Sequence, residues 1–140
     1  MAITTHVDIV SAEREIFSGI AEMVVATGEL GEVGIVPGHA PFLTLLKPGE
    51  IRVTLPDGKE DIYYISGGML EVQPYCVTVL ADAVERADNL DEASALAAKA
   101  RAEEMIASKN TNIDYSVAAG ELARAVAQIR AIQKARKKLK

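Results

Sequence analysis

The chain has 140 residues, a formal net charge of −5 and a sequence pI near 5.1. Apolar residues make up 49% and charged residues 25%, which is the composition of an ordinary globular protein. The acidic balance argues against nucleic acid as a partner, because phosphate binding requires a basic face. No run approaches the roughly 20 apolar residues that a membrane span requires.

The N-terminal segment MAITTHVDIV has neither the basic start nor the apolar run of an export signal, so we expect a cytoplasmic location. Cys76 is the only cysteine, which excludes an internal disulfide framework. Because it begins the strand-like run Cys-Val-Thr-Val-Leu, we expect it to be a small core residue.

Short β-branched runs separated by Gly and Pro fill the first 86 residues and predict strands. They lie at residues 6–10, 22–26, 51–55, 62–65 and 77–80. Pro56-Asp57-Gly58 separates two of them and predicts a hairpin over residues 51–66. Regularly spaced short strands indicate a sandwich or a barrel.

The remaining residues, 87–140, predict an antiparallel helical hairpin. Asn89 and Glu92 have the spacing of a capping pair, and an apolar stripe follows at Ala95, Ala98, Ala102, Met105 and Ile106. Asp114 can cap a second helix to about Arg136, with a coiled-coil-like stripe at Ala118, Leu122, Ala125, Ile129 and Ile132. The domain boundary is therefore expected at residues 86 and 87.

The stripe between the helices consists mostly of methyl groups, each contributing only about 0.8 kcal/mol when buried. A weakly packed hairpin with good intrinsic helicity can leave its docking surface without unfolding, which favours a mobile element. Alanine stripes also permit close permanent packing, so a fixed hairpin remains the alternative.

The sequence shows no catalytic or cofactor signature. Two histidines and one cysteine make a metal site improbable, and no phosphate-binding loop or nucleophile elbow is present, so we expect no metal and no cofactor. Ser66-Gly67-Gly68 predicts a turn between strands. His39, between two prolines, is the best acid-base candidate, but it has no partner at an informative spacing, which favours a docking role.

Six segments together are similar to the epsilon subunit of bacterial F-type ATP synthases, in order along the whole chain. They are Ser11-Ala-Glu, Phe17-Ser-Gly, Gly31-Glu-Val-Gly-Ile-Val-Pro-Gly-His-Ala-Pro, Thr44 to Gly49, Ser66-Gly-Gly-Met-Leu-Glu-Val and Asn89-Leu-Asp-Glu-Ala. The resemblance implies a ten-stranded β-sandwich followed by an antiparallel helical hairpin. It also implies a non-catalytic central-stalk subunit on the cytoplasmic face of the bacterial inner membrane.

The partners that the resemblance implies are the gamma subunit, the ring of c subunits and, for an extended inhibitory tail, the alpha and beta catalytic subunits. The loop containing Glu32 and His39 is expected to meet the c-ring. The tail contacts to the acidic catalytic subunits are expected at Arg124, Arg130, Lys134, Arg136 and Lys137. A solvated basic helix end is the alternative reading of the last seven residues.

Some members of this family bind ATP between the folded helices. The residues that fit that motif here are Leu90, Asp91, Ala95, Arg101 and Arg124. Ser94 and Gln128 stand where the motif has arginines, so we expect ATP binding to be weak or absent. The sequence also allows two other functions: a free-standing nucleotide-sensing module, or a small β-sandwich enzyme that uses His39.

Overall fold

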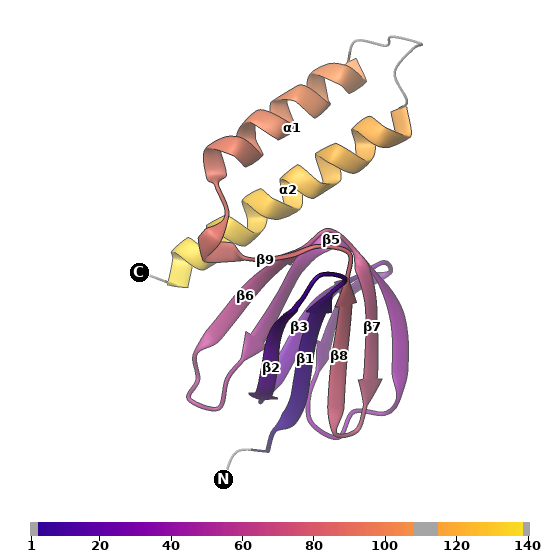
Figure 1. Cartoon of the computed structure of the whole chain (residues 1–140), viewed down its shortest axis with the longest axis vertical. Helices are drawn as coiled ribbons and strands as arrows, with labels where there is room; N and C mark the ends of the chain where they lie inside the picture. The colour runs from indigo at the N-terminus through magenta and orange to yellow at the C-terminus, as the bar shows by residue number, and fades with distance from the viewer. Residues whose placement is uncertain (1–2, 108–114, 139–140) are drawn as a thin grey trace.

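The computed structural model describes residues 3–107 and 115–138, and it shows a β-sandwich with a two-helix hairpin packed on one end (Figure 1). The strands are β1 (Thr5–Ser11), β2 (Glu15–Ala21), β3 (Met23–Gly28), β4 (Gly31–Ile35), β5 (Phe42–Thr54), β6 (Glu60–Ile65), β7 (Gly68–Gln73), β8 (Cys76–Ala81) and β9 (Val84–Arg86). A 3₁₀ turn (Ala87–Asn89) leads to helices α1 (Glu92–Ala107) and α2 (Tyr115–Lys138). The predicted fold class is confirmed.

Strand β5 joins the two layers of the sandwich. Its first half, residues 42–46, pairs with β7, and its second half, residues 46–54, pairs with β3 and β6. One layer therefore continues through β7, β8, β1 and β2, and the other contains β4, β3, β6 and β9. The described residues form nine strands rather than the expected ten, because β5 runs unbroken through Lys47-Pro48-Gly49.

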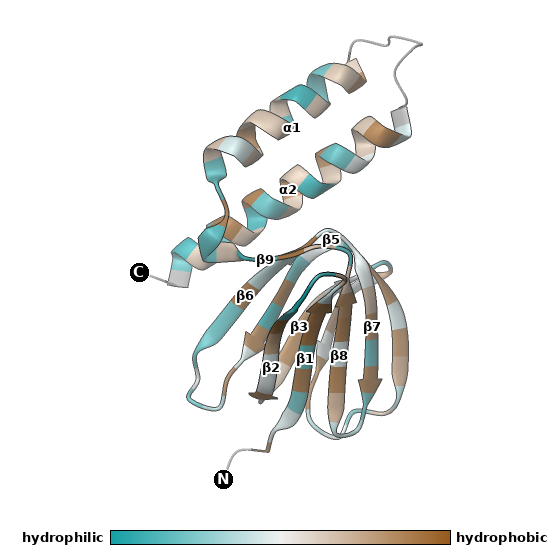
Figure 2. Cartoon of the chain, in the orientation of Figure 1, coloured by the Kyte–Doolittle hydropathy of each residue, from teal (hydrophilic) through white to brown (hydrophobic). Residues whose placement is uncertain are grey.

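The core between the layers is built by alternation along each strand. Val7 and Ile9 of β1, and Val77 and Val79 of β8, are at most 1% exposed, while their neighbours in sequence point outward. Figure 2 shows that the strands carry most of the strongly hydrophobic residues, whereas the helices are mainly pale or teal. Cys76 lies outside this core and is half-buried, so its expected core position is wrong: the alternation places Val77, not Cys76, inside.

Both predicted turns are present. In the first, the amide of Gly58 donates to the Leu55 carbonyl at 2.9 Å, which confirms the β5–β6 hairpin. In the second, Ser66-Gly67-Gly68 connects β6 to β7, and a Cβ on Gly68 would lie 2.1 Å from the Leu80 carbonyl oxygen. Only glycine at the start of β7 allows it to approach β8 so closely, so this segment is a structural turn.

The first helix begins two residues later than a cap at Asn89 would require. The Asp91 carboxylate accepts a hydrogen bond from the Ala93 amide at 3.1 Å, and Asn89 ends the preceding 3₁₀ turn. Asp91 is therefore the N-cap, because its side chain can reach a free amide of the first turn. The expected cap at Asp114 lies outside the described residues.

The two helices pack through alanines, as the stripes predicted. Ala95 and Ala102 of α1 and Ala118 and Ala125 of α2 are buried, and Ile132 is buried near the end of α2. The other predicted members are partly buried: Ala98, Met105, Ile106, Leu122 and Ile129. No helix in the described part of the chain is both long and apolar enough to cross a membrane.

Candidate functional site

A second buried face of α2 contacts the outside of the sandwich. Ala127 and Ala131 pack on Ile62 and Tyr64 of β6 and on Ala87, forming a small cluster separate from the sandwich core. Burial raises the pKa of the Tyr64 hydroxyl. A hydrogen bond with the Gln128 side chain lowers this pKa, but by less. The hairpin is thus held on the sandwich by this small cluster, against which Leu90 and Ala135 also pack, and by a few polar contacts.

The cations expected at tail contacts divide into two groups in this docked arrangement. Lys134 forms an ion pair with Glu50 of β5, and Arg136 forms one with Glu92 at the start of α1. The remaining three, Arg124, Arg130 and Lys137, lie at exposed positions of α2. Two of the five cations are therefore paired with carboxylates of the same chain, but only Lys134 is paired with the sandwich.

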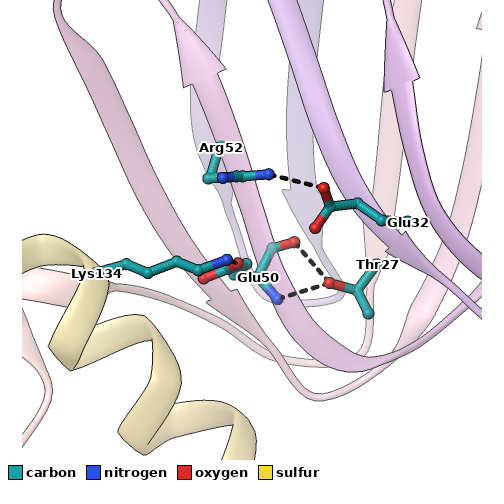
Figure 3. A network of polar contacts seen from close by, with 5 residues as sticks. All are labelled: Thr27, Glu32, Glu50, Arg52 and Lys134. Atoms are coloured by element: carbon teal, nitrogen blue, oxygen red, sulfur yellow. Dashed lines mark hydrogen bonds and ion pairs between the residues drawn. The ribbon is translucent and has the colours of Figure 1, made fainter.

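Glu50 belongs to a polar network at the sandwich–hairpin boundary (Figure 3). Its side chain points toward Lys134, while the Thr27 hydroxyl lies 3.3 Å from both its amide nitrogen and its carbonyl oxygen. Beside it, an Arg52 guanidinium nitrogen lies 2.9 Å from a Glu32 carboxylate oxygen. Glu50 is only 7% exposed, so this carboxylate is the most deeply buried charge described in the chain.

An open hollow of about 480 Å³ lies between the two helices. Its lining includes Arg101 of α1 and Arg124 of α2, together with Gln128. Glu121 also lines it and places a negative charge beside the arginines, which opposes the binding of a polyphosphate. The hollow thus brings together Arg101 and Arg124, two cations expected for a nucleotide site, and Gln128, which stands where the motif has an arginine.

The other residues of the expected nucleotide motif have different surroundings. Asp91 caps α1, Leu90 packs against the Ala87–Ala131 cluster, and Ala95 is buried in the seam between the helices. Ser94 is exposed on α1. None of these four belongs to the described lining of the hollow.

Glu32 and His39, expected in one loop, lie in different elements. Glu32 is inside β4, where it pairs with Thr27 of β3, because the strand already begins at Gly31. Its side chain lines a groove shared with α2, on the hairpin side of the sandwich. His39 lies in the loop after β4, close to the β7–β8 turn, since the neighbouring Gly38 amide donates to the Pro74 carbonyl.

The surroundings of His39 suit a fixed contact residue. Its Nδ1 lies 2.6 Å from the Ala40 carbonyl oxygen, and its ring makes an edge contact with Phe42 at 6.1 Å between centroids. On β1 and β2, a separate histidine, His6, lies near Asp8 and Ser18, but both groups contact its Nε2. A catalytic relay needs the carboxylate and the hydroxyl on opposite ring nitrogens, so this cluster lacks that geometry.

Glu50 and Tyr64 form much of the docking surface but were not predicted from the sequence. The available signal was the run Ile62-Tyr63-Tyr64-Ile65, which is apolar at every position instead of alternating. Such a run indicates a strand that is buried on both faces. Since Glu50 pairs with Tyr64 across β5 and β6, the same reasoning would have placed it under the covering element.

Comparison with known protein families matches two adjoining parts of the chain. Residues 4–87 match the family described as ATP synthase, Delta/Epsilon chain, beta-sandwich domain, and residues 88–133 match its long alpha-helix domain. The ATP synthase epsilon chain of Legionella pneumophila (strain Corby) is 76% identical over 140 residues and covers 100% of both chains. That of Nitrosococcus oceani is 60% identical over 139 residues and covers 99% of both.

Solved structures share the fold at much lower identity. A chain of the Euglena gracilis mitochondrial ATP synthase has a TM-score of 0.75 at 22% identity, covering 91% of this chain and 79% of its own. A chain of the Tetrahymena thermophila mitochondrial ATP synthase central stalk and c-ring has a TM-score of 0.56 at 14% identity, covering 94% and 95%. With both family matches and the full-length relatives, the chain belongs to the epsilon subunits of bacterial F-type ATP synthases.

Proposed function

We propose that this chain is a rotor subunit of the central stalk, coupling proton flow through the c-ring to ATP synthesis, with a helical tail that inhibits ATP hydrolysis. As an epsilon chain it is a non-catalytic subunit of the ATP synthase, so the alternative of an enzyme using His39 is wrong. The observation that carries the proposal is the full-length 76% identity to an epsilon chain. The proposed division is a docking domain at residues 1–86 and a regulatory domain at 87–140.

The proposed partners are the gamma subunit, the c-ring and, for the extended tail, the alpha and beta subunits. In this assignment the chain is peripheral, on the cytoplasmic face of the bacterial inner membrane. His39 suits the c-ring contact because its loop lies at one end of the sandwich, where a backbone hydrogen bond ties it to the β7–β8 turn. Glu32 is also proposed for the c-ring, but it lies on the hairpin side of the sandwich, where its carboxylate is paired with Arg52 and lines a groove shared with α2.

The proposed inhibitory tail is supported by weak docking and by charge. Ala127 and Ala131 each bury little more than a methyl group on the sandwich, worth about 0.8 kcal/mol apiece. The basic residues Arg124, Arg130, Lys134, Arg136 and Lys137 all lie on α2. Once extended, they present a positive surface to acidic catalytic subunits.

The test compares ATP hydrolysis by the complex reconstituted with the full chain and with a chain ending at Arg86. We expect faster hydrolysis with the shortened chain, because the proposed inhibitory element is absent. The shortened chain must still co-purify with the gamma subunit, which verifies its assembly. Equal rates from two fully assembled complexes would contradict the inhibitory role.

The second candidate is nucleotide sensing, favoured by the hollow that Arg101 and Arg124 share. Two arginines with Gln128 and Glu121 offer less positive charge than a triphosphate requires, so we expect at most weak binding. Calorimetry with ATP tests this, with Arg101→Ala as the site variant. Binding near millimolar or tighter that Arg101→Ala abolishes would establish the sensing function.

A further inference from the structure

The strongest unexplained feature of the chain is the buried carboxylate of Glu50. Its side chain is 9% exposed and meets the Lys134 ammonium, which comes from α2 and is 38% exposed. Among the described residues, Glu50 Oε2 has no hydrogen-bond partner. A buried carboxylate is strongly disfavoured unless it is paired, so Lys134 is the group that makes this position tolerable.

The backbone around Glu50 is built to aim this carboxylate at α2. The Thr27 hydroxyl bonds both peptide groups of Glu50, and this contact requires glycine at position 49. A Cβ on Gly49 would lie 2.6 Å from the Thr27 Cβ, so any other residue would displace Thr27. Thr27 thus holds the backbone of Glu50 (Figure 3), and Gly49 leaves room for that contact, so the three residues form a preorganised acceptor site on the sandwich.

The other ion pair at the end of α2 does not connect the hairpin to the sandwich. Arg136 pairs with Glu92, and both residues belong to the hairpin, so their contact moves with it. The Gln128–Tyr64 hydrogen bond does connect the hairpin to the sandwich, but it is neutral. Charged hydrogen bonds are about twice as strong as neutral ones.

We infer that the Glu50–Lys134 pair is the latch that sets how often the hairpin leaves the sandwich. When α2 departs, Lys134 is freed and Glu50 becomes exposed to water. Under the proposed function, Lys134 is also a cation for the acidic catalytic subunits. It cannot pair with Glu50 and with them at once, so docking and inhibition compete for the same side chain.

The experiment measures undocking directly through a cysteine beneath α2. Ala127→Cys is made in the full chain together with Cys76→Ser, and its alkylation by iodoacetamide is timed. Ala127 is 5% exposed, so a thiol there reacts only while the hairpin is undocked. We expect Glu50→Gln and Lys134→Met each to raise this rate about tenfold.

A double variant tests whether the two residues act as a pair. Glu50→Gln with Lys134→Met should react no faster than the faster single variant, because one contact is lost once. The matched control is Lys99→Met, which removes a positive charge from α1 without touching the sandwich, and we expect no change. Single-variant rates equal to this control, or a double variant near the product of both effects, would overturn the latch.

Two further measurements separate this inference from its premises. Cys76, kept in a chain without Ala127→Cys, should react at an unchanged rate, which shows that the sandwich stays folded. In the reconstituted complex, Glu50→Gln should strengthen inhibition, whereas Lys134→Met should not, because it also removes the tail contact. Faster alkylation with unchanged hydrolysis would uphold the latch and contradict only the inhibitory tail.

Discussion

The pKa of Asp8 is lowered, first by the Ser18 hydroxyl, which donates to its carboxylate at 2.7 Å, and then by His6. A lowered pKa means that the carboxylate stabilises the fold above its unfolded pKa, about 3.9. This stability is lost as the pH falls through the pKa that Asp8 has in the folded chain. Ser18→Ala should therefore raise the pKa of Asp8, measured by NMR titration of the side-chain carboxyl carbon.

The control for this titration is Ser11→Ala, since the Ser11 hydroxyl serves the local turn at Arg14 and does not contact Asp8. We expect the Asp8 pKa to be the same in this variant as in the parent chain. An Asp8 pKa that Ser18→Ala leaves unchanged would show that the hydrogen bond is not its main cause.

Gly68 is a position where any side chain is costly. Its φ of +148° and the 2.1 Å approach to the Leu80 carbonyl oxygen leave no room for a Cβ. Gly68→Ala should lower the free energy of unfolding by about 3 kcal/mol, measured by urea denaturation. Gly120→Ala on α2 is the control: its Cβ meets only Arg124 at 3.6 Å, so helicity should rise.

Single residues also show where sequence reasoning stops. The Ser66-Gly67-Gly68 turn was predicted because glycine pairs serve local geometry, which neighbours in sequence decide. Glu50 was missed because its burial depends on α2, more than 80 residues later in the chain. Glu32 was placed in a loop because flanking glycines suggest one, whereas pairing with β3 continues the strand through Gly31.

At the scale of the helix, the cap of α1 is set by Asp91. Asp91→Ala should destabilise the helix by about 1 kcal/mol, because the Ala93 amide loses its acceptor. The expected result is lower helicity by far-ultraviolet circular dichroism during mild heating. Asn89→Ala is the matched control, and an equal loss there would return the cap to Asn89.

The covering of β6 by α2 has a signature in tyrosine ionisation. Tyr64 is 5% exposed under α2, and its raised pKa follows mainly from that burial. Docking favours the neutral hydroxyl, so the stability that Tyr64 gives the docked state is present below about pH 10. It is lost as the pH rises through the pKa that Tyr64 has when docked. A chain ending at Arg86 should show a lower Tyr64 pKa, measured by NMR with tyrosine labelled at Cζ.

Tyr63 is the internal control for this measurement. It lies on the opposite face of β6, inside the sandwich core, and its pKa is also raised by burial. Removing the tail should leave the pKa of Tyr63 raised. A Tyr64 pKa that stays equally high without α2 would mean that the strand itself, not the helix, buries the hydroxyl.

The sequence predicted which segments form helices and strands better than it predicted where each of them begins and ends. The hairpin over residues 51–66 and both helices follow from local turn and stripe patterns, and the structure confirms them. The first half of β5 was not predicted, because Lys47-Pro48-Gly49 has the composition of a turn. Only the two sets of cross-strand partners, β7 on one side and β3 and β6 on the other, keep this segment extended.

For the whole molecule, the decisive feature is that the buried residues form two unequal clusters. The sandwich core extends from Val7 to Val84 and contains none of the hairpin residues that the structure describes. The second cluster joins Ile62, Tyr64 and Ala87 to two alanines of α2. Since the first cluster is complete without the tail, the sandwich has the physical basis to fold alone, whereas α1 and α2 bury most of their apolar surface against each other and the sandwich.

A chain ending at Arg86 should therefore unfold in one cooperative urea transition. Loss of the tail uncovers Ile62 and Tyr64 only where Ala127 and Ala131 cover them, so the midpoint should fall slightly. The free energy of unfolding should also depend less steeply on urea concentration, since the shortened chain exposes less surface when it unfolds.

A second shortened chain carries Ile62→Thr and Tyr64→Ser. These substitutions replace the apolar side chains that loss of the tail uncovers, which limits association between molecules, and they leave the inner core of the sandwich intact. A gradual transition without a baseline, in both shortened chains, would mean that the hairpin is part of the folding unit, and undocking would then require the sandwich to loosen as well.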